Sequence, residues 1–178
     1  MFMLRLSLFC LSFVCFNALA IEKGPNLGKR ASAKLIKQWD LDIFPNGKGL
    51  PKGQGNTTAG KKVYTKHCVS CHGVDGTGNS ADELAGAAHS LTDNPPDKTI
   101  GTYWPYATTL FDFTRRSMPL YAPGILTNNE VYAVTAYLLY LNGIIDKDKI
   151  INANTLPKVK MPNRNGFINI YQKEKQHD

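Results

Sequence analysis

Five consecutive residues, Cys68-Val69-Ser70-Cys71-His72, combine two thiols and an imidazole in the spacing C-x-x-C-H. In an exported protein this spacing is the attachment signature of c-type haem. The two thiols can add to the two vinyl groups of the porphyrin, because the two-residue gap turns both sulfurs toward one edge of the ring. The neighbouring imidazole can then bind the iron. The pentapeptide predicts one covalent haem c, attached through Cys68 and Cys71, with His72 as an axial iron ligand.

Two other kinds of site use paired cysteines, and the rest of the sequence argues against both. A zinc ribbon needs a second C-x-x-C or paired histidines. The remaining cysteines, Cys10 and Cys15, lie in an N-terminal segment that we expect to be removed. A thioredoxin-like redox pair belongs beside a βαβ pattern, and no strand pattern is convincing. Haem attachment is therefore the preferred interpretation.

The second axial ligand has several candidates. A methionine thioether favours ferrous iron and raises the reduction potential, whereas a second histidine lowers it. Met118 follows an expected helix, and Pro119 fixes the backbone directly beyond it. Met118 is preferred, with His89, Met161 or an open position as alternatives.

Cations and aromatic residues precede Met118. Arg115 and Arg116 can pair with haem propionates, because a guanidinium makes bidentate hydrogen bonds to a carboxylate. The alternative is a solvated helix end, where cations suit the helix dipole. Tyr103, Trp104 and Tyr106 are expected to pack on the porphyrin ring, with hydrogen bonds to a propionate as the alternative.

The first twenty residues have the pattern of a signal peptide. Arg5 supplies the positive charge, residues 6–16 are apolar, and Ala18-Leu19-Ala20 fits a cleavage site. The apolar run is shorter than the roughly 20 residues that span a bilayer. We expect cleavage after Ala20, export to the periplasm and a mature protein that does not span the membrane. An uncleaved anchor or a buried helix is the alternative.

The composition allows one domain with tails. The chain has 178 residues, of which 43% are apolar, enough for a packed core. Its net charge of +7 suits acidic partners or an anionic surface. No basic run is interleaved with aromatic residues, so nucleic acid is not expected. Asp40 and Asp112 are isolated acids and Ser70 has no base, so we find no proton-transfer pair or nucleophile.

The periodicity predicts three helices and a long loop. The first covers 58–68, with Thr57 or Thr58 as its cap. The second covers 105–116, with a proline in its first turn. The third covers 127–142, where Thr127 and Glu130 form a capping box, one face is buried and Gly143 ends the helix. Residues 73–103 are expected to wrap the haem as a loop, and 155–178 to be extended or partly disordered.

These features resemble class I cytochromes c. Gly60-x-x-x-Tyr64 is similar to the family's glycine and aromatic pair, where a small residue lets the last helix cross closely, and Ala136-Tyr137-Leu138 is similar to the matching half. The resemblance implies an all-α fold. The expected organisation is a signal peptide (1–20), an N-terminal lead (21–57), a cytochrome c domain (58–145) and a C-terminal extension (146–178).

A narrower resemblance covers most of the expected mature chain. It is to the cytochrome subunit of sulfite and sulfane dehydrogenases, and it is carried by residues 39–40, 100–113, 115–119, 123–124, 130–143 and 156–167. Some members of that group carry two haem domains, whereas this chain has one C-x-x-C-H, as the single-haem members do. The resemblance implies one-electron transfer in sulfur oxidation.

The resemblance also implies partners. A molybdenum-containing sulfite or sulfane dehydrogenase subunit is the expected electron donor, and a downstream cytochrome or oxidase the acceptor. Residues 155–178 are interpreted as a clamp on the donor, with a lid over the protein's own core as the alternative. The rival function is a haem enzyme subunit with substrate-accessible iron in the oxidation of thiosulfate or another sulfur compound.

Overall fold

The computed structural model describes residues 27–170, which divide into two units with a boundary between Asp40 and Leu41. The expected signal peptide lies outside the described residues. In the first unit, Ser32 caps helix α2 (Ala33–Trp39), because its side chain accepts a hydrogen bond from the Leu35 amide, and no residue of this helix is buried. Within the described residues, none of the helices has the length and apolar character needed to cross a membrane.

The second unit is built from helices, so the all-α prediction is confirmed. Its helices are α3 (Thr57–His67), α4 (Val69–His72), α5 (Ile100–Tyr103), α6 (Ala107–Ser117) and α7 (Asn128–Leu141). Two 3₁₀ turns, η2 (Val74–Gly76) and η3 (Leu156–Lys158), and two short antiparallel strands, β1 (Gln54–Gly55) and β2 (Ile151–Asn152), complete the described elements. The sequence did not reveal the strands, because two residues are too few to show an alternating pattern.

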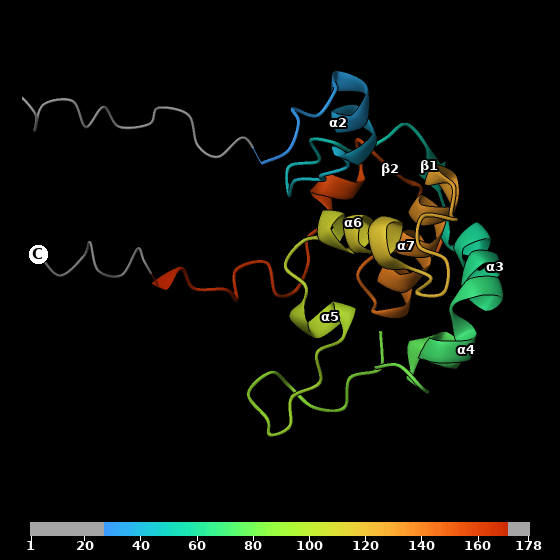
Figure 1. Cartoon of the computed structure of the whole chain (residues 1–178). Coiled ribbons are helices and arrows are strands. Elements are labelled where there is room, and N and C mark those ends of the chain that lie inside the picture. Colours follow the sequence, from blue (N-terminus) through green and yellow to red (C-terminus); the bar gives the residue numbers. More distant parts are fainter. Residues whose placement is uncertain (1–26, 171–178) are drawn as a thin grey trace, which may run out of the picture. The chain divides into compact units, whose positions relative to one another are not determined.

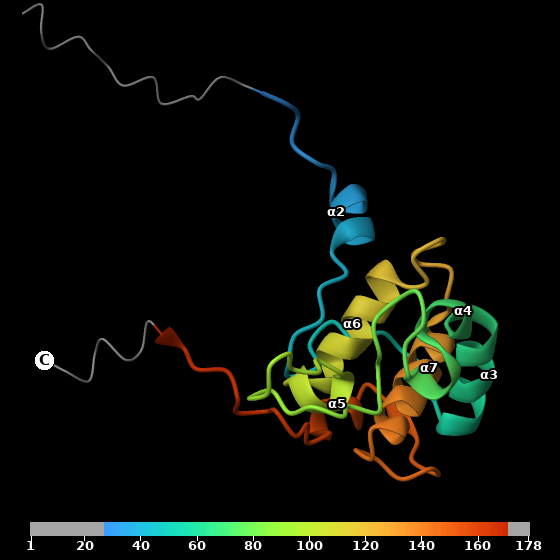
Figure 2. The same ribbon diagram turned by 90° about the horizontal axis from the view of Figure 1, so that it is seen from below.

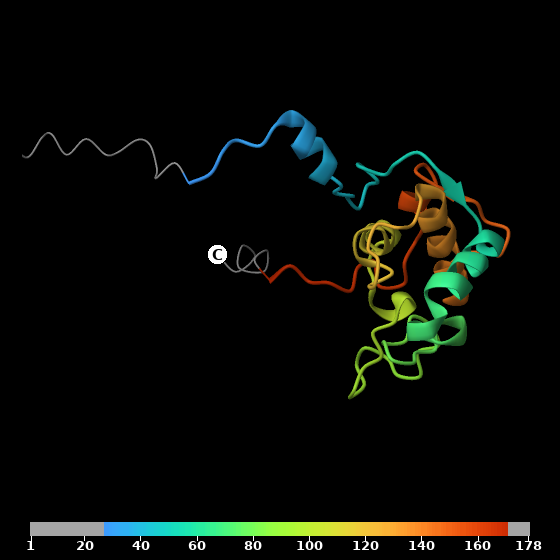
Figure 3. The same cartoon turned by 45° about the vertical axis from the view of Figure 1, so that its right-hand side comes forward.

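Helix α7 forms the centre of the second unit, between α6 and α3 (Figures 1, 2 and 3). The predicted capping box is confirmed: Thr127 and Glu130 bond each other's backbone amides. Gly143, with φ of 66°, follows the Asn142 cap as expected. The prediction that only one face of α7 is buried underestimated its burial, since every residue from 131 to 139 is buried. Elements on several sides of α7 remove it from water, which the spacing of apolar residues could not show.

The crossing of α3 and α7 depends on Gly60, as predicted. A β-carbon at this position would collide with the carbonyl group of Ala133 and lie 2.7 Å from the β-carbon of Tyr137. The partners of Gly60 are therefore Ala133, which lies before the expected segment Ala136-Tyr137-Leu138, and Tyr137, which belongs to it. The predicted cap of α3 was wrong: the Asn56 side chain accepts from the Ala59 amide, whereas the Thr57 hydroxyl donates to a distant carbonyl, that of Lys147.

The described part of the C-terminal extension packs on its own domain. Leu156 and Met161 belong to the buried core, and Val159 packs against it. Beyond them, the Asn163 amide donates to the Tyr103 carbonyl at 2.7 Å. The expectation of an extended tail was wrong for 156–161, because the apolar side chains that seemed to need a partner cover the protein's own core, and the clamp on a donor stays a prediction.

Candidate haem site

An apolar cavity of about 470 Å³ brings the main predicted site residues together. Cys68, Cys71, His72 and Met118 all line it. Most of the other lining residues are apolar or aromatic: Ala81, Leu84, Ile100, Trp104, Leu110, Phe113, Pro119, Leu120, Tyr121 and Leu138, with His67, Ser80 and Thr114. This volume lies in the range of cofactor pockets, about 300–1,000 Å³. The cavity combines two thiols, an imidazole and a thioether on an apolar background.

The C-x-x-C-H segment forms the short helix α4 directly after α3. The amides of Cys71 and His72 both donate to the Cys68 carbonyl, at 3.1 and 2.9 Å, so the pentapeptide is wound into one helical turn. Nδ1 of His72 lies 2.9 Å from the Asp82 carbonyl oxygen. A carbonyl can only accept, so Nδ1 carries a proton, and the ring nitrogen left to bind a metal is Nε2. This is the orientation that an iron ligand requires.

Two tyrosines hold the chain that follows His72. The Tyr64 hydroxyl of α3 donates to the Gly73 carbonyl at 2.9 Å, and the Tyr137 hydroxyl of α7 donates to Asp75 at 2.6 Å. Their rings pack at 5.4 Å between centroids. Burial is the main cause that raises the pKa of Tyr64 to about 12 and raises the pKa of Tyr137 as well, so both hydroxyls stay protonated donors. The helix crossing thereby also positions the segment that carries the imidazole.

Met118 reaches the apolar cavity from the end of α6. Its amide closes the helix by donating to the Thr114 carbonyl at 3.1 Å, and the half-buried side chain is followed by buried Pro119. Leu120 and Tyr121 continue the cavity wall but are 78% and 69% exposed, so they mark its outer margin.

A hydrogen bond between His67 and Tyr121 connects the two sides of the site. Nδ1 of His67 and the Tyr121 hydroxyl are 2.9 Å apart, and both residues line the apolar cavity. This bond joins the end of α3 to the segment after Met118. Sequence reasoning missed it, because neither residue belongs to a motif and they are far apart in the chain.

The other ligand candidates lie elsewhere. Neither His89 nor Met161 lines the apolar cavity. His89 is exposed and its ring lies 3.4 Å from the Asp97 carboxylate, which also accepts from the backbone amides of His89 and Ala88. These contacts lower the pKa of Asp97, the His89 amide contributing most. Met161 is 3% exposed within the hydrophobic core. Of the methionines in the described part of the chain, Met118 is the one that lines the cavity.

Trp104 lines the apolar cavity, and its ring stands edge-on to Phe113 at 5.7 Å. The two arginines do not line it. Arg116 forms salt bridges with Asp112 and Asp42, and hydrogen bonds to these carboxylates are the main causes that raise its pKa. The propionate role of Arg115 and Arg116 stays a prediction, and Arg116 would have to exchange its present partners to fulfil it.

The environment of the cysteines disfavours a redox pair. Burial, with a smaller effect of Cys71, raises the pKa of the Cys68 thiol to about 11. Redox-active and nucleophilic thiols have lowered pKa values instead. The surroundings of Cys68 are therefore unlike those of a redox-active thiol.

Comparisons with known proteins agree on one family. The cytochrome c family model matches residues 57–142. Over 78 residues the chain is 37% identical to the cytochrome c subunit of alcohol dehydrogenase (quinone) from Gluconobacter oxydans strain 621H. That alignment covers 37% of this chain and 16% of the Gluconobacter protein, so the likeness spans a small part of the relative's length.

A solved structure extends the likeness to most of the chain. A chain of the sulfane dehydrogenase SoxCD from Paracoccus pantotrophus superimposes with a TM-score of 0.76 and 37% sequence identity, covering 86% of this chain and 76% of that one. The apolar cavity, its two thiols and its imidazole fit the haem c that a cytochrome c domain implies. The chain belongs to the cytochrome c family and has the class I fold of a haem-binding electron-transfer protein.

Proposed function

We propose that this chain is a periplasmic single-haem cytochrome that passes electrons one at a time. One haem c would be attached through Cys68 and Cys71, with His72 and Met118 as axial ligands. When bound, the haem supplies a one-electron iron couple. The observation that carries the proposal is that the three side chains of the C-x-x-C-H segment and Met118, which is distant from them in sequence, line one apolar cavity.

The residues of the cavity explain why electron transfer is favoured over catalysis on a substrate bound to the iron. The Asp82 carbonyl orients the imidazole of His72, and Met118 offers a thioether that favours ferrous iron. Buried Ile100, Leu110 and Leu138 exclude water from the cavity, which also disfavours ferric iron with its higher charge. If His72 and Met118 both held the iron, no position would remain for a substrate, so the haem enzyme is the less favoured function.

The donor that we propose is a molybdenum-containing sulfite or sulfane dehydrogenase subunit, with a downstream cytochrome or oxidase as acceptor. The extent of the SoxCD likeness supports a dehydrogenase partner in sulfur oxidation. The Gluconobacter relative supports the broader role, since it is a cytochrome subunit of another dehydrogenase. Leu120 and Tyr121, both exposed, give a partner one approach to the cavity.

The axial ligand is tested with Met118→Ala in the purified holoprotein. Axial ligands move haem potentials over a range of about 0.8 V, so we expect loss of the sulfur–iron charge-transfer band and a potential lower by about 0.1 V or more. Met161→Ala is the matched control: it should lose stability through its core cavity and keep both the band and the potential. High-spin iron in the unaltered protein would favour the haem enzyme instead.

The donor is tested by mixing the holoprotein with a sulfane or sulfite dehydrogenase catalytic subunit from the same host and its substrate. Reduction should be at least tenfold faster than that of an unrelated class I cytochrome c. Equal rates would reject the donor and leave the general electron carrier standing.

A further inference from the structure

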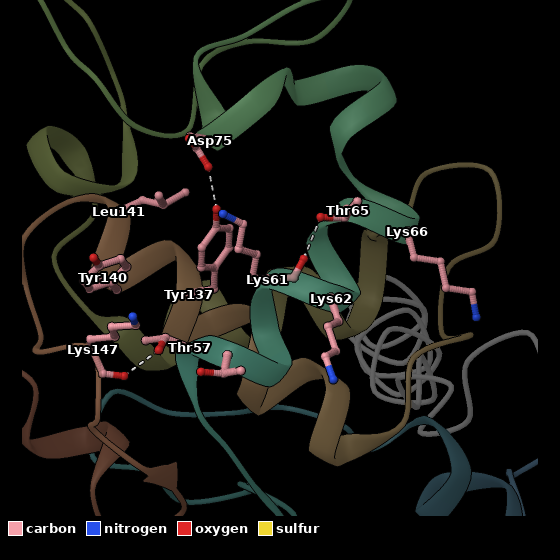
Figure 4. A pocket seen from close by; sticks show the side chains of 11 residues that line it. Thr57, Lys61, Lys62, Thr65, Lys66, Asp75, Tyr137, Tyr140, Leu141 and Lys147 are labelled. Carbon is pink, nitrogen blue, oxygen red and sulfur yellow. Dashed lines mark hydrogen bonds between the residues drawn. The ribbon is translucent and has the colours of Figure 1, made fainter.

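Helix α7 and its C-terminal cap residue hold the loop after His72 at two points. Near the start of the loop, the Tyr137 hydroxyl donates to the Asp75 carboxylate, a contact drawn in Figure 4. Farther along the loop, the Leu84 carbonyl accepts a hydrogen bond of 3.0 Å from Nδ2 of Asn142. Asn142 caps α7 and does not line the apolar cavity. Its side chain can therefore act on the haem site only through the segments that it ties together.

Both polar atoms of the Asn142 side chain are hydrogen bonded. Besides Leu84, its Nδ2 group donates to the Leu138 carbonyl at 2.8 Å, and its Oδ1 atom accepts from the Gly101 amide at 3.0 Å. The two carbonyls can only accept and the backbone amide can only donate, so one orientation of the side-chain amide fits these partners. Neither an aliphatic side chain nor a carboxylate of similar size can make all three bonds. The position therefore requires asparagine.

The residue that faces Asn142 on α5 leaves room for this contact. A β-carbon at Gly101 would lie only 2.7 Å from Oδ1 of Asn142, so a side chain there would push the amide away. Gly101 follows Ile100, which is 1% exposed and lines the apolar cavity. The Ile100 amide also donates to the Leu84 carbonyl at 3.2 Å. Helix α5 and Asn142 therefore meet at one acceptor, and this junction holds a wall of the cavity against the end of α7.

The bond to Leu84 reaches the axial imidazole through a short stretch of backbone. The Asp82 carbonyl, whose oxygen lies 2.9 Å from Nδ1 of His72, precedes Leu84 by two residues. On the other side of Asp82, the chain is held to the C-x-x-C-H turn, because the Ala81 amide donates to the Cys71 carbonyl at 2.9 Å. The Asp82 carbonyl therefore lies between one anchor on the haem-attachment turn and one on α7. Loss of the second anchor frees this carbonyl, and the ring bonded to it, to turn.

We propose that Asn142 is a positioning residue for the axial imidazole. By fixing Leu84 to the end of α7, it keeps the Asp82 carbonyl in place, and this carbonyl sets the plane of the His72 ring. The inference rests on the proposed function for His72 as an iron ligand. A partner that orients a ligating imidazole also tunes its basicity and hence the metal. Asn142 thus adjusts the haem site from outside the cavity.

The test uses NMR of the purified holoprotein and its Asn142→Ala variant. In ferric low-spin haem, the proton resonances of the ring methyl groups depend on the direction of the axial ligand plane. We expect these resonances to shift in Asn142→Ala, because the Asp82 carbonyl and the His72 ring turn together. Hydrogen exchange of the Leu84 and Gly101 amides should become at least tenfold faster, because the junction with α7 opens.

The matched control is Thr57→Val. The Thr57 hydroxyl donates to the Lys147 carbonyl (Figure 4), so it also ties a helix to the segment around the end of α7, but Thr57 does not line the apolar cavity. Valine keeps the shape of the side chain, so this variant loses a hydrogen bond of the same kind. It should keep the methyl resonances and change exchange at Gly101 less than twofold. Equal shifts of the methyl resonances in both variants would overturn the proposal, because a general loss of stability would then explain them.

Asn142→Asp separates the donor from the acceptor. The aspartate can still accept from the Gly101 amide, but it cannot donate to the Leu84 carbonyl. The methyl resonances should therefore shift as in the alanine variant, while the Gly101 amide stays protected from exchange. Unchanged methyl resonances in Asn142→Asp would overturn the proposal. This variant decides the question if Asn142→Ala does not retain its haem.

The unaltered holoprotein separates failure of this inference from failure of the proposed function. A ferric spectrum without histidine ligation would reject His72 as the ligand, and the inference with it. A histidine-ligated protein whose Asn142 variants keep the original methyl resonances would reject the inference alone and leave the electron carrier standing.

Discussion

Cys68 and His72 reach the apolar cavity from a helical turn, whereas Met118 reaches it from the end of a helix and an irregular segment. On the first side, backbone hydrogen bonds wind α4, the Asp82 carbonyl holds the imidazole, and Tyr64 and Tyr137 fix the chain beyond it. On the second side, exposed Leu120 and Tyr121 directly follow Met118 and Pro119.

This difference separates two tasks of an electron-transfer site. The cysteine side is held by α3 and α7, the most extensively packed pair of helices in the second unit, so it provides a fixed point of attachment. The methionine side has fewer described hydrogen bonds and more exposed apolar surface. We therefore expect changes on the cysteine side to affect folding, and changes on the methionine side to affect mainly the ligand and the contact with partners.

The largest effect should follow removal of both thiols. Cys68→Ala/Cys71→Ala should lose covalent haem and leave an unstable protein, because the wall residues of the apolar cavity lose the surface they pack on. Haem staining on a denaturing gel and thermal unfolding measure the two effects. Exposed Ser70→Ala is the control within the same turn and should keep both. A stably folded double variant without haem would contradict the proposal.

The second-largest effect should follow deletion of the C-terminal extension. Deleting 155–178 removes Leu156 and Met161, each almost fully buried, and burial of such a side chain contributes about 1.5–3 kcal/mol. We expect the free energy of unfolding of the holoprotein to fall by about 3 kcal/mol or more, measured in guanidinium. Deleting only 171–178 should change it little. If the longer deletion left stability unchanged and only slowed reduction by the donor, the extension would be a clamp after all.

A somewhat smaller loss is expected at the helix crossing. Gly60→Leu places a side chain against the Ala133 carbonyl, and overpacking of this kind costs about 3 kcal/mol, because backbone must move. Chemical unfolding of the holoprotein gives the value. Ala59→Leu, at the exposed neighbouring position of α3, should stay within about 0.5 kcal/mol. Similar losses in both variants would mean that the crossing is not the rigid support of the cysteine side.

The smallest effect on stability should follow loss of the hydrogen bond at the outer margin of the apolar cavity. Tyr121→Phe removes the hydroxyl that bonds His67, and an exposed hydrogen bond contributes about 0.5–1.5 kcal/mol. Global unfolding should therefore change by no more than this, while hydrogen exchange of amides 118–126 should become faster. Tyr140→Phe on α7, also partly exposed, is the control. Unchanged exchange in the loop would show that the bond does not restrain the methionine side.

The sequence was sufficient to predict the features that depend on residue type and on neighbours in the chain. The capping box of Thr127 and Glu130 and the stop at Gly143 involve neighbours in the chain, so their geometry follows from residue type and spacing. Gly60 was predictable because a helix that crosses closely at one point tolerates only a small residue there. The C-x-x-C-H segment and Met118 were identified as ligand candidates by their chemistry, and the structure places them in one cavity.

Tertiary structure decided the features that depend on distant partners. The imidazole of His72 is oriented by a backbone carbonyl, which every residue possesses, so no side chain in the sequence signals it. Arg116 pairs with Asp42, and Met161 joins the core, through contacts between remote segments. The sequence determined which groups are able to bind a haem and where single helices end. Only the folded chain decided which groups face the cavity. Burial and pairing depend on contacts between segments that are far apart in the sequence, and the local spacing of residues does not reveal these contacts.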